Sequence, residues 1–184
     1  MDSEFKINET DIPGLLEIEL WMLEDDRGYF QEKYQKAKLL KAGFLPSFNP
    51  VQHNISFNKK SGVTRGIHAE PWDKYISPIN GKIYAVFVDL RKANFGKKVE
   101  MFVDSKKAVF VPEGVANSYQ ALEDGTFYSY LVNDHWSEDK TYKAVNLADP
   151  RLAIAWPINL DMATVSAKDK NNPFLDEVEP FNHL

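Results

Sequence analysis

Stretches rich in β-branched and aromatic residues, separated by turn-forming residues, dominate the middle of the chain. They run over residues 82–91 (KIYAVFVDLR), 107–115 (KAVFVPEGV) and 127–136 (FYSYLVNDHW), and Gly, Pro, Asn or Asp bounds them. Their composition and partial alternation of apolar and polar positions predict β-strands. Short strands at this spacing predict an all-β protein with a few short helices, built as a jelly-roll β-barrel or sandwich.

Helical periodicity is scarce along the chain. One segment, FQEKYQKAKLLKAG (residues 30–43), repeats apolar residues at helical spacing, and Gly43 offers a C-terminal stop. We therefore expect a helix there. The tail from Ser166 to Leu184 is polar and punctuated by proline, so it is either a loosely packed arm or a segment that returns to cover a pocket.

Length and composition indicate one ordinary globular domain. The chain has 184 residues, of which 43% are hydrophobic and 27% charged, whereas domains typically hold about 100–150 residues. No apolar run approaches the roughly 20 residues that a membrane span needs. The N-terminal stretch MDSEFKINETDIPG lacks the apolar segment of a secretory signal. We expect a cytoplasmic protein that does not bind membranes.

Charge and cysteine content exclude several classes of function. The chain contains no cysteine, which rules out disulfides, thiolate zinc sites and cysteine nucleophiles. Its net charge of −5 argues against nucleic acid as a partner, because nucleic-acid-binding domains usually carry a basic face. A small anionic ligand is still compatible, since a diphosphate needs only a few local Arg or Lys donors.

The segment GVTRGIHAEPWDKY brings three candidate functional residues, Arg65, His68 and Lys74, close together in the chain. Arg65 and His68 are three positions apart, so in a regular strand they would not share a face. A bend at Gly66 could bring them together. Taken alone, a histidine in such a segment is more often a hydrogen-bonded structural residue than a base.

Metal and serine chemistry have weak support in the sequence. His68 has no second histidine two positions further on, and His53, His135 and His183 occur singly, so a metal site would need long-range convergence. No Gly-x-Ser-x-Gly elbow and no phosphate-binding P-loop occur. We expect neither a metal nor a cofactor.

Six sequence blocks, in order, resemble one enzyme family. They are DDRGYFQEKY, VQHNISFNKKSGVTRGIHAEPWDKY, GKIYAVFVDLRKANFG, VFVPEGVANSYQAL, YSYLVNDHW and ADPRLAIAWP. The chain is similar to the dTDP-4-dehydrorhamnose 3,5-epimerases, cupin-fold enzymes of the rhamnose pathway that supply surface-polysaccharide synthesis. The resemblance implies a single RmlC-like cupin domain over residues 1–184. It also implies a homodimer, in which an N-terminal arm (about residues 1–35) reaches the neighbouring subunit's site, and a C-terminal tail (about residues 160–184) that covers the site.

The same resemblance implies four catalytic residues. His68, in the RGxH motif, matches the general base, and Asp169, in the stretch SAKD, matches the carboxylate that orients it. Tyr130 matches the opposite-face acid, although Tyr128 has the same strand parity. Lys74 matches the cation near the developing oxyanion.

Substrate-binding roles carry over to a larger set of residues. They are Arg27, Glu32, Gln52, Asn54, Arg65, Asn117, Trp136 and Lys168. Within this set the resemblance assigns Arg65 to the diphosphate, for which a planar bidentate donor is suited. It assigns Trp136 to stacking on the nucleotide base.

Three departures from the family pattern concern the nucleotide end of the site more than the chemistry. The usual Gln-Asp-Asn is Gln52-His53-Asn54, the common Ala-His-Gly is Ala116-Asn117-Ser118, and the usual tyrosine pair is His135-Trp136. The base, the acid and the lysine are all present.

The leading hypothesis is epimerisation at C3 and C5 of dTDP-4-dehydro-6-deoxy-D-glucose. Two alternatives stay open: a C3-only epimerase acting on a CDP- or GDP-linked sugar, and a catalytically silent cupin that binds a sugar nucleotide. The joint presence of His68, Lys74, Tyr130 and Asp169 speaks against the silent alternative.

Overall fold

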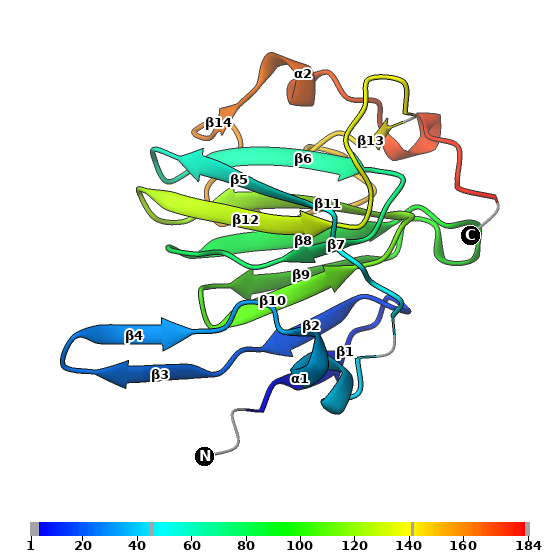
Figure 1. Cartoon of the computed structure of the whole chain (residues 1–184). Coiled ribbons are helices and arrows are strands. Elements are labelled where there is room, and N and C mark those ends of the chain that lie inside the picture. Colours follow the sequence, from blue (N-terminus) through cyan, green and yellow to red (C-terminus); the bar gives the residue numbers. More distant parts are fainter. Residues whose placement is uncertain (1–3, 45, 141, 183–184) are drawn as a thin grey trace.

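The computed structural model describes residues 4–44, 46–140 and 142–182, and two β-sheets face one another in it (Figure 1). The first sheet has the strand order β1 (Lys6–Glu9), β2 (Leu16–Glu19), β10 (Lys107–Val111), β7 (Lys74–Ile76), β12 (Thr126–Val132) and β5 (Gln52–Asn58). The second has the order β13 (Lys143–Ala144), β6 (Val63–Ala69), β11 (Val115–Ala121), β8 (Ile83–Asp89) and β9 (Lys98–Val103), with β14 (Thr164–Val165) paired to β6. The predicted all-β sandwich of the jelly-roll kind is confirmed.

Strand β8 is buried on both faces, which explains its almost continuous apolar sequence. Ala85 and Phe87 belong to the core between the two sheets. Val86 and Val88 point the other way, into a second apolar cluster on the outer face of the sheet. C-terminal residues such as Leu175 complete that second cluster, so the sandwich has a covering layer outside its second sheet.

Helix α1 (Lys36–Lys41) is shorter than the helix predicted over residues 30–43. It begins after Gln35, whose side chain accepts a hydrogen bond from the Lys38 N–H at 2.7 Å and caps the helix. Gly43 follows the helix with φ +93°, as a stop signal should. Phe30 and Gln31 instead belong to β4 (Gly28–Gln31), which pairs with β3 (Met22–Asp25). Hairpin pairing therefore outweighs helical periodicity at this end.

Two predicted strands extend too far. The stretch 107–115 breaks at Pro112–Gly114, where the Val115 N–H bonds the Pro112 carbonyl at 3.1 Å and Gly114 has φ +85°. This turn separates β10 from β11. The stretch 127–136 ends as a strand at Val132, whereas the stretch 82–91 is confirmed as β8.

The described part of the tail packs against the second sheet. Strand β14 pairs with β6, and helix α2 (Ala167–Lys170) follows it on the outer side of β6 (Figure 1). A 3₁₀ turn (Leu175–Glu177) comes next, and the Asn146 amide donates to the Asn172 carbonyl at 2.9 Å. Another 3₁₀ turn (Lys92–Asn94) lies between β8 and β9. Residues 183–184, including His183, lie outside the described residues.

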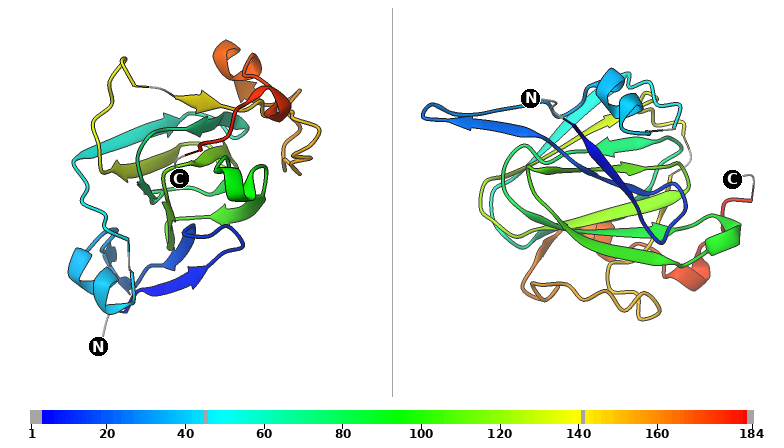
Figure 2. Two further views of the ribbon diagram at one scale, coloured as in Figure 1. Left: turned by 90° about the vertical axis from the view of Figure 1, so that its right-hand side faces the viewer. Right: turned by 90° about the horizontal axis from the view of Figure 1, so that it is seen from below.

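The β3–β4 hairpin projects away from the sandwich, as the views in Figures 1 and 2 show. It forms a separate two-stranded sheet, and its side chains Leu23, Tyr29 and Phe30 are exposed. Lys33 attaches the base of the hairpin to the body, because its ammonium donates to the carbonyls of Pro78, at 2.9 Å, and Ser105. The hairpin is thus fixed at its base and uncovered along its length.

Gly81 and Gly125 test how close packing constrains the turns beside β12. Both have positive φ, +83° and +73°. A Cβ on Gly81 would lie 2.9 Å from Thr126 Cβ and 3.0 Å from Thr126 Cα, whereas a Cβ on Gly125 would have nothing within 4 Å. Gly125→Ala should lower the free energy of unfolding by about 1 kcal/mol, for backbone strain alone. Gly81→Ala should cost about 1–3 kcal/mol more, for overpacking. Urea unfolding measures both losses, and equal losses would contradict this explanation.

Candidate active site

A β-bulge in β6 brings Arg65 and His68 to one face. His68 pairs with Asn117 of β11 and Arg65 pairs with Tyr119, so Gly66 and Ile67 lie opposite the single residue Ser118. The extra residue shifts the alternation of side chains by one. Gly66 has φ +124°, and a Cβ there would lie 2.6 Å from Ser118 Cβ, so glycine is needed at the bulge. The bend expected at Gly66 is confirmed.

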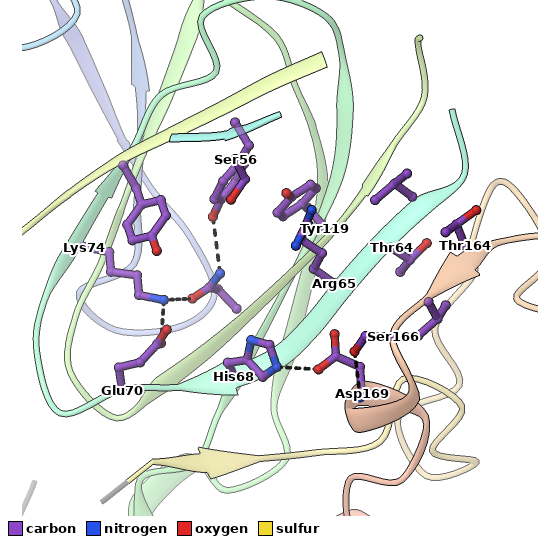
Figure 3. Close-up of a pocket in the computed structure, with 15 residues that line it drawn as sticks. Ser56, Thr64, Arg65, His68, Glu70, Lys74, Tyr119, Thr164, Ser166 and Asp169 are labelled. Carbon is purple, nitrogen blue, oxygen red and sulfur yellow. Dashed lines mark hydrogen bonds and ion pairs between the residues drawn. The ribbon is translucent and has the colours of Figure 1, made fainter. Parts of the chain in front are cut away.

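His68 is bonded to a carboxylate from the tail. Its Nε2 lies 2.7 Å from Asp169 Oδ1, while Asp169 Oδ2 accepts the Gly66 N–H at 3.3 Å. Asp169 lies on α2, where the Ser166 hydroxyl accepts the Asp169 N–H at 3.0 Å and caps the helix. The tail therefore holds its carboxylate against His68 and the bulged part of β6, and Figure 3 shows the two side chains pointing toward one another.

The pKa of Asp169 is lowered despite its burial. Burial by itself raises the pKa of the carboxyl group, but the hydrogen bond and charge of His68, with the N–H bond from Gly66, outweigh it. The carboxylate is thus ionised at neutral pH and can only accept hydrogen bonds. It follows that His68 Nε2 carries the proton in this pair, so the other ring nitrogen of a neutral His68 is free to accept one.

A lysine and a glutamate form a second pair in the same cavity. Lys74 Nζ lies 2.5 Å from Glu70 Oε2 and donates to Asn117 Oδ1 at 2.7 Å. The Asn117 amide in turn donates to the Tyr128 hydroxyl at 3.3 Å. Only 6% of the Lys74 side chain is exposed, so this ammonium is removed from bulk water and held by fixed acceptors.

Three tyrosines form one wall of the cavity. Tyr119 and Tyr128 stack with ring centroids 4.0 Å apart, and Tyr130 lies 5.6 Å beyond Tyr128. Lys74 Nζ is 5.3 Å from the centre of the Tyr130 ring. Burial, with the charge of Glu70 as the next cause, raises the pKa of Tyr130 to about 12. Its hydroxyl therefore keeps its proton at neutral pH.

Arg65 is oriented by a neutral amide. Its Nε donates to Asn58 Oδ1 at 3.3 Å, and the Tyr119 hydroxyl donates to the same oxygen at 3.1 Å. Asn58 is buried, and its amide nitrogen donates to the Thr126 carbonyl at 3.1 Å. Since its contact is neutral, the guanidinium retains its full positive charge toward the cavity.

These groups line one cavity of about 430 Å³ between the sheets and the tail (Figure 3). Six of the residues singled out in the sequence line it: Arg65, His68, Lys74, Asn117, Tyr130 and Asp169. Among the lining residues that the sequence analysis missed are Ser56, Glu70, Tyr119 and, as a site residue, Tyr128. Ser56 continues the alternation of Gln52 and Asn54 on β5, and Glu70 precedes Lys74 by four residues, so both signals were present in the sequence.

Gln52, Asn54 and Trp136 form a group beside the cavity. Asn54 lies opposite Tyr130 in register, and its side-chain oxygen accepts the Gln52 amide at 2.8 Å. Gln52 Oε1 accepts the backbone N–H of Trp136 at 3.1 Å. The Trp136 side chain itself is exposed, and the structure does not bring it into the cavity.

Arg27, Glu32 and Lys168 also lie outside the cavity of their own chain. Arg27 is at the tip of the projecting hairpin, where it pairs with Asp25 at 2.6 Å and 90% of its side chain is exposed. Glu32 pairs with Lys38 at the start of α1. Lys168 is exposed on α2, next to the buried Asp169.

The departures from the family pattern have different positions in the structure. His53 lies on the outer face of β5, where its Nε2 is 2.7 Å from the Ser129 hydroxyl. It therefore points away from the cavity that Asn54 and Ser56 approach. Asn117 lies inside the cavity, bonded to Lys74, and His135 lies beyond the end of β12. The imidazole at position 53 thus does not alter this cavity.

Over the described ranges, no group of three or more His, Asp or Glu side chains is arranged to hold a metal ion. Within the same ranges, no helix has the length and apolar character needed to cross a membrane.

Known proteins similar to this chain agree on one family. The model of the family described as dTDP-4-dehydrorhamnose 3,5-epimerase matches residues 9–177. A relative from Streptococcus pyogenes serotype M6, named as an RmlC homolog, is 48% identical, with 92% of this chain and 89% of the relative covered. A dTDP-4-dehydrorhamnose 3,5-epimerase from Methanothermobacter thermautotrophicus is 32% identical over 92% of this chain and 94% of its own length.

Solved structures show the same relationship. RmlC from Streptococcus suis, determined in complex with dTDP-D-xylose, is 45% identical and superimposes with a TM-score of 0.92, covering 97% of this chain and 95% of that one. The enzyme from Bacillus anthracis, solved with TDP and pyrophosphate, gives 31% identity and a TM-score of 0.84, over 92% and 99% of the two chains. The resemblance drawn from the six sequence blocks is confirmed, and the chain belongs to the dTDP-4-dehydrorhamnose 3,5-epimerase family.

Proposed function

We propose that this protein inverts C3 and C5 of dTDP-4-dehydro-6-deoxy-D-glucose. The observation that carries the proposal is the His68–Asp169 pair, 2.7 Å apart, on the wall of a cavity that also holds Tyr130 and Lys74. The names of the relatives and the dTDP-D-xylose complex of the Streptococcus suis protein support the choice of substrate. A cytoplasmic location and a homodimeric assembly are part of the same proposal.

The chemistry requires a base, an acid and a cation around a ketone. A C4 ketone acidifies the C–H bonds at C3 and C5, so removal of either proton leaves an enolate with its charge on the C4 oxygen. Return of a proton to the opposite face of the carbon inverts the centre. The protein therefore has to place its base and its acid on opposite sides of the sugar ring.

His68 acts as the base through the ring nitrogen that does not face Asp169. The ionised carboxylate accepts the Nε2 proton at 2.7 Å, which fixes the tautomer and stabilises the imidazolium that forms when the proton arrives. Asp169 is bonded to His68, so its role is to position and support the base.

Tyr130 acts as the acid from the other wall. With its pKa raised to about 12 by burial and by Glu70, the phenol is protonated at neutral pH and is a donor for the enolate carbon. Lys74 supplies the positive charge for the C4 oxygen, in a cavity with little water, where fixed charges act strongly. Arg65 binds the diphosphate.

The N-terminal arm completes the site of a second subunit. A two-stranded hairpin is only marginally stable alone, and the exposed Leu23, Tyr29 and Phe30 of β3–β4 are apolar surface left in water. Arg27 at its tip lies outside its own cavity. Docking of the hairpin on a partner would bury these side chains and bring Arg27 and Glu32 to the partner's substrate. The chain that holds the general base His68 also binds the nucleotide. The residues that do so are Gln52, Asn54, Trp136 and Lys168.

Incubation with dTDP-4-dehydro-6-deoxy-D-glucose in deuterium oxide tests the reaction, with mass and proton spectra of the sugar as the measurement. Two deuterons are expected in the wild-type product, at C3 and C5. One deuteron would replace the proposal with C3-only epimerisation, and none would favour a binding protein or another nucleotide. His68→Asn should abolish incorporation while dTDP still binds, and His53→Asn should retain it.

Tyr130→Phe separates exchange from inversion. His68 can still remove a proton and return a deuteron to the same face, so deuterium should enter the sugar while formation of the inverted product falls by about 10²-fold or more. Proton spectra distinguish the two sugars. Tyr142→Phe, whose hydroxyl bonds Ser137 outside the cavity, is the matched control. Equal loss of exchange and inversion in Tyr130→Phe would remove this tyrosine from the role of acid.

Asp169→Asn should weaken both activity and stability, in a pH-dependent way. The lowered pKa of Asp169 means that its carboxylate stabilises the fold above the unfolded pKa, near 4, and that this contribution is lost as pH falls through the folded pKa. At pH 7 the variant should lose about 1–3 kcal/mol of unfolding free energy and about 10²-fold in rate. Below the folded pKa of Asp169, which lies under its unfolded pKa, the stability difference should close. Asp176→Asn, at an exposed tail aspartate, is the control, and a pH-independent difference would contradict the ionic role.

Co-expression of two inactive variants tests the arm. A dimer of one His68→Asn chain and one Arg27→Ala chain contains one site with both changes and one site with neither, if the arm acts across the interface. Such a mixed dimer, isolated with two affinity tags, should recover up to about half of the wild-type rate, whereas either variant alone should stay weak. Absence of recovery would show that Arg27 serves its own subunit or no site at all.

A further inference from the structure

Glu70 is a charged cavity residue that the proposed mechanism does not use. It lies in the turn after β6, and its Oε2 is 2.5 Å from Nζ of Lys74, the first residue of β7. The side chains of Glu70 and Lys74 are 16% and 6% exposed. A pair this far from water differs from a surface ion pair, because each charge depends on the other for compensation.

Two side chains hold the ammonium group of Lys74. Of its three N–H donors, one is donated to Asn117 Oδ1 in the described part of the chain, and Glu70 Oε2 is its ion-pair partner at 2.5 Å. Asn117 is itself held by its bond to the Tyr128 hydroxyl. The third N–H is left for an oxygen of the bound sugar, so Glu70 and Asn117 together determine where the ammonium points.

A carboxylate so close to Lys74 also has a cost, since it opposes negative charge on the enolate oxygen. Against this, an ammonium that is as buried as that of Lys74 is strongly disfavoured when it is left unpaired, and it tends to lose its proton. Glu70 Oε2 lies 2.5 Å from Lys74 Nζ, and an enolate oxygen on the far side of the ammonium would be further from this carboxylate. The attraction between Glu70 and Lys74 is therefore stronger than the repulsion between Glu70 and the enolate oxygen. The net effect is a lysine that stays charged and aimed, with its attraction for the oxyanion reduced in part.

Other charged and titratable groups face the same cavity from every surrounding element. They are Arg65 and His68 on β6, Tyr119 on β11, Tyr128 and Tyr130 on β12, and Asp169 on α2. Of the two carboxylates, Asp169 is bonded to His68, so Glu70 is the one in contact with Lys74. Among the charged groups, Glu70 also contributes most to the raised pKa of Tyr130, after burial.

We propose that Glu70 is a positioning residue that keeps Lys74 charged and directed at the C4 oxygen. The proposal rests on the epimerase function proposed above. Removal of the Glu70 charge disfavours the ammonium of Lys74, so its effect should appear at high pH.

The test is the pH–rate profile of Glu70→Gln, which keeps the size and an acceptor oxygen but removes the charge. The high-pH limb of kcat should move to lower pH by about one unit or more, while the rate on the acidic side stays within about tenfold of wild type. At neutral pH, the KM of the variant should differ from that of wild type by a smaller factor than its kcat does. A uniform loss at every pH, with the limb in place, would show a merely structural residue and would overturn the proposal.

Glu100→Gln is the matched control. Glu100 also pairs with a lysine, Lys98, in a half-buried position, but it lies on β9, outside the cavity. Its removal should leave the limb where it is in wild type. A shift of the same size in Glu100→Gln would mean that any buried glutamate acts through overall charge, which would also overturn the proposal.

A second measurement does not depend on turnover. Competitive labelling with acetic anhydride, read by mass spectrometry, reports the pH at which Lys74 becomes reactive. In Glu70→Gln that pH should fall by about one unit or more, and in Glu100→Gln it should not move. An unchanged pH of labelling would overturn the role of Glu70. If wild type exchanged no deuterium but the labelling shifted, the epimerase function would fail while the control of Lys74 by Glu70 would stand.

Discussion

The hydrogen bond between His68 and Asp169 joins two side chains that are 101 positions apart, and the architecture around it is arranged to make that contact. The bulge at Gly66 turns His68 toward the cavity, and β14 aligns the tail along β6 so that α2 begins beside it. Ser166 caps that helix. Each of these features is local, but together they bring an ionised carboxylate out of water and onto one imidazole nitrogen.

Charge is distributed unevenly between the cavity and the whole molecule. The chain carries a net charge of −5, yet within the cavity both carboxylates are paired, Asp169 with His68 and Glu70 with Lys74. Arg65 contacts the neutral Asn58. Among the described residues of the cavity, the Arg65 guanidinium is therefore a positive charge that contacts no carboxylate, and such a charge suits an anionic ligand although the chain as a whole is acidic.

Rigid and exposed parts of the molecule have separate roles. The sandwich is packed on both sides of β8 and holds His68, Lys74 and Tyr130 on its strands, which favours precise geometry. The β3–β4 hairpin, in contrast, extends beyond the sandwich with apolar side chains uncovered (Figure 1). In the proposed dimer, the first part performs the chemistry and the second part contributes to binding in the other subunit.

The sequence by itself determined the strand-rich fold, because short-range composition and turn residues are enough to predict strands such as β8. It also identified His68, Lys74, Tyr130 and Asp169, through ordered motifs. Only the tertiary structure decided that Gln31 is in a strand, that Glu70 and Ser56 share the cavity, and that Arg27 and Trp136 do not. Strand pairing, the bulge and the return of the tail decide these points, and all three depend on contacts between residues far apart in the chain, which no local pattern contains.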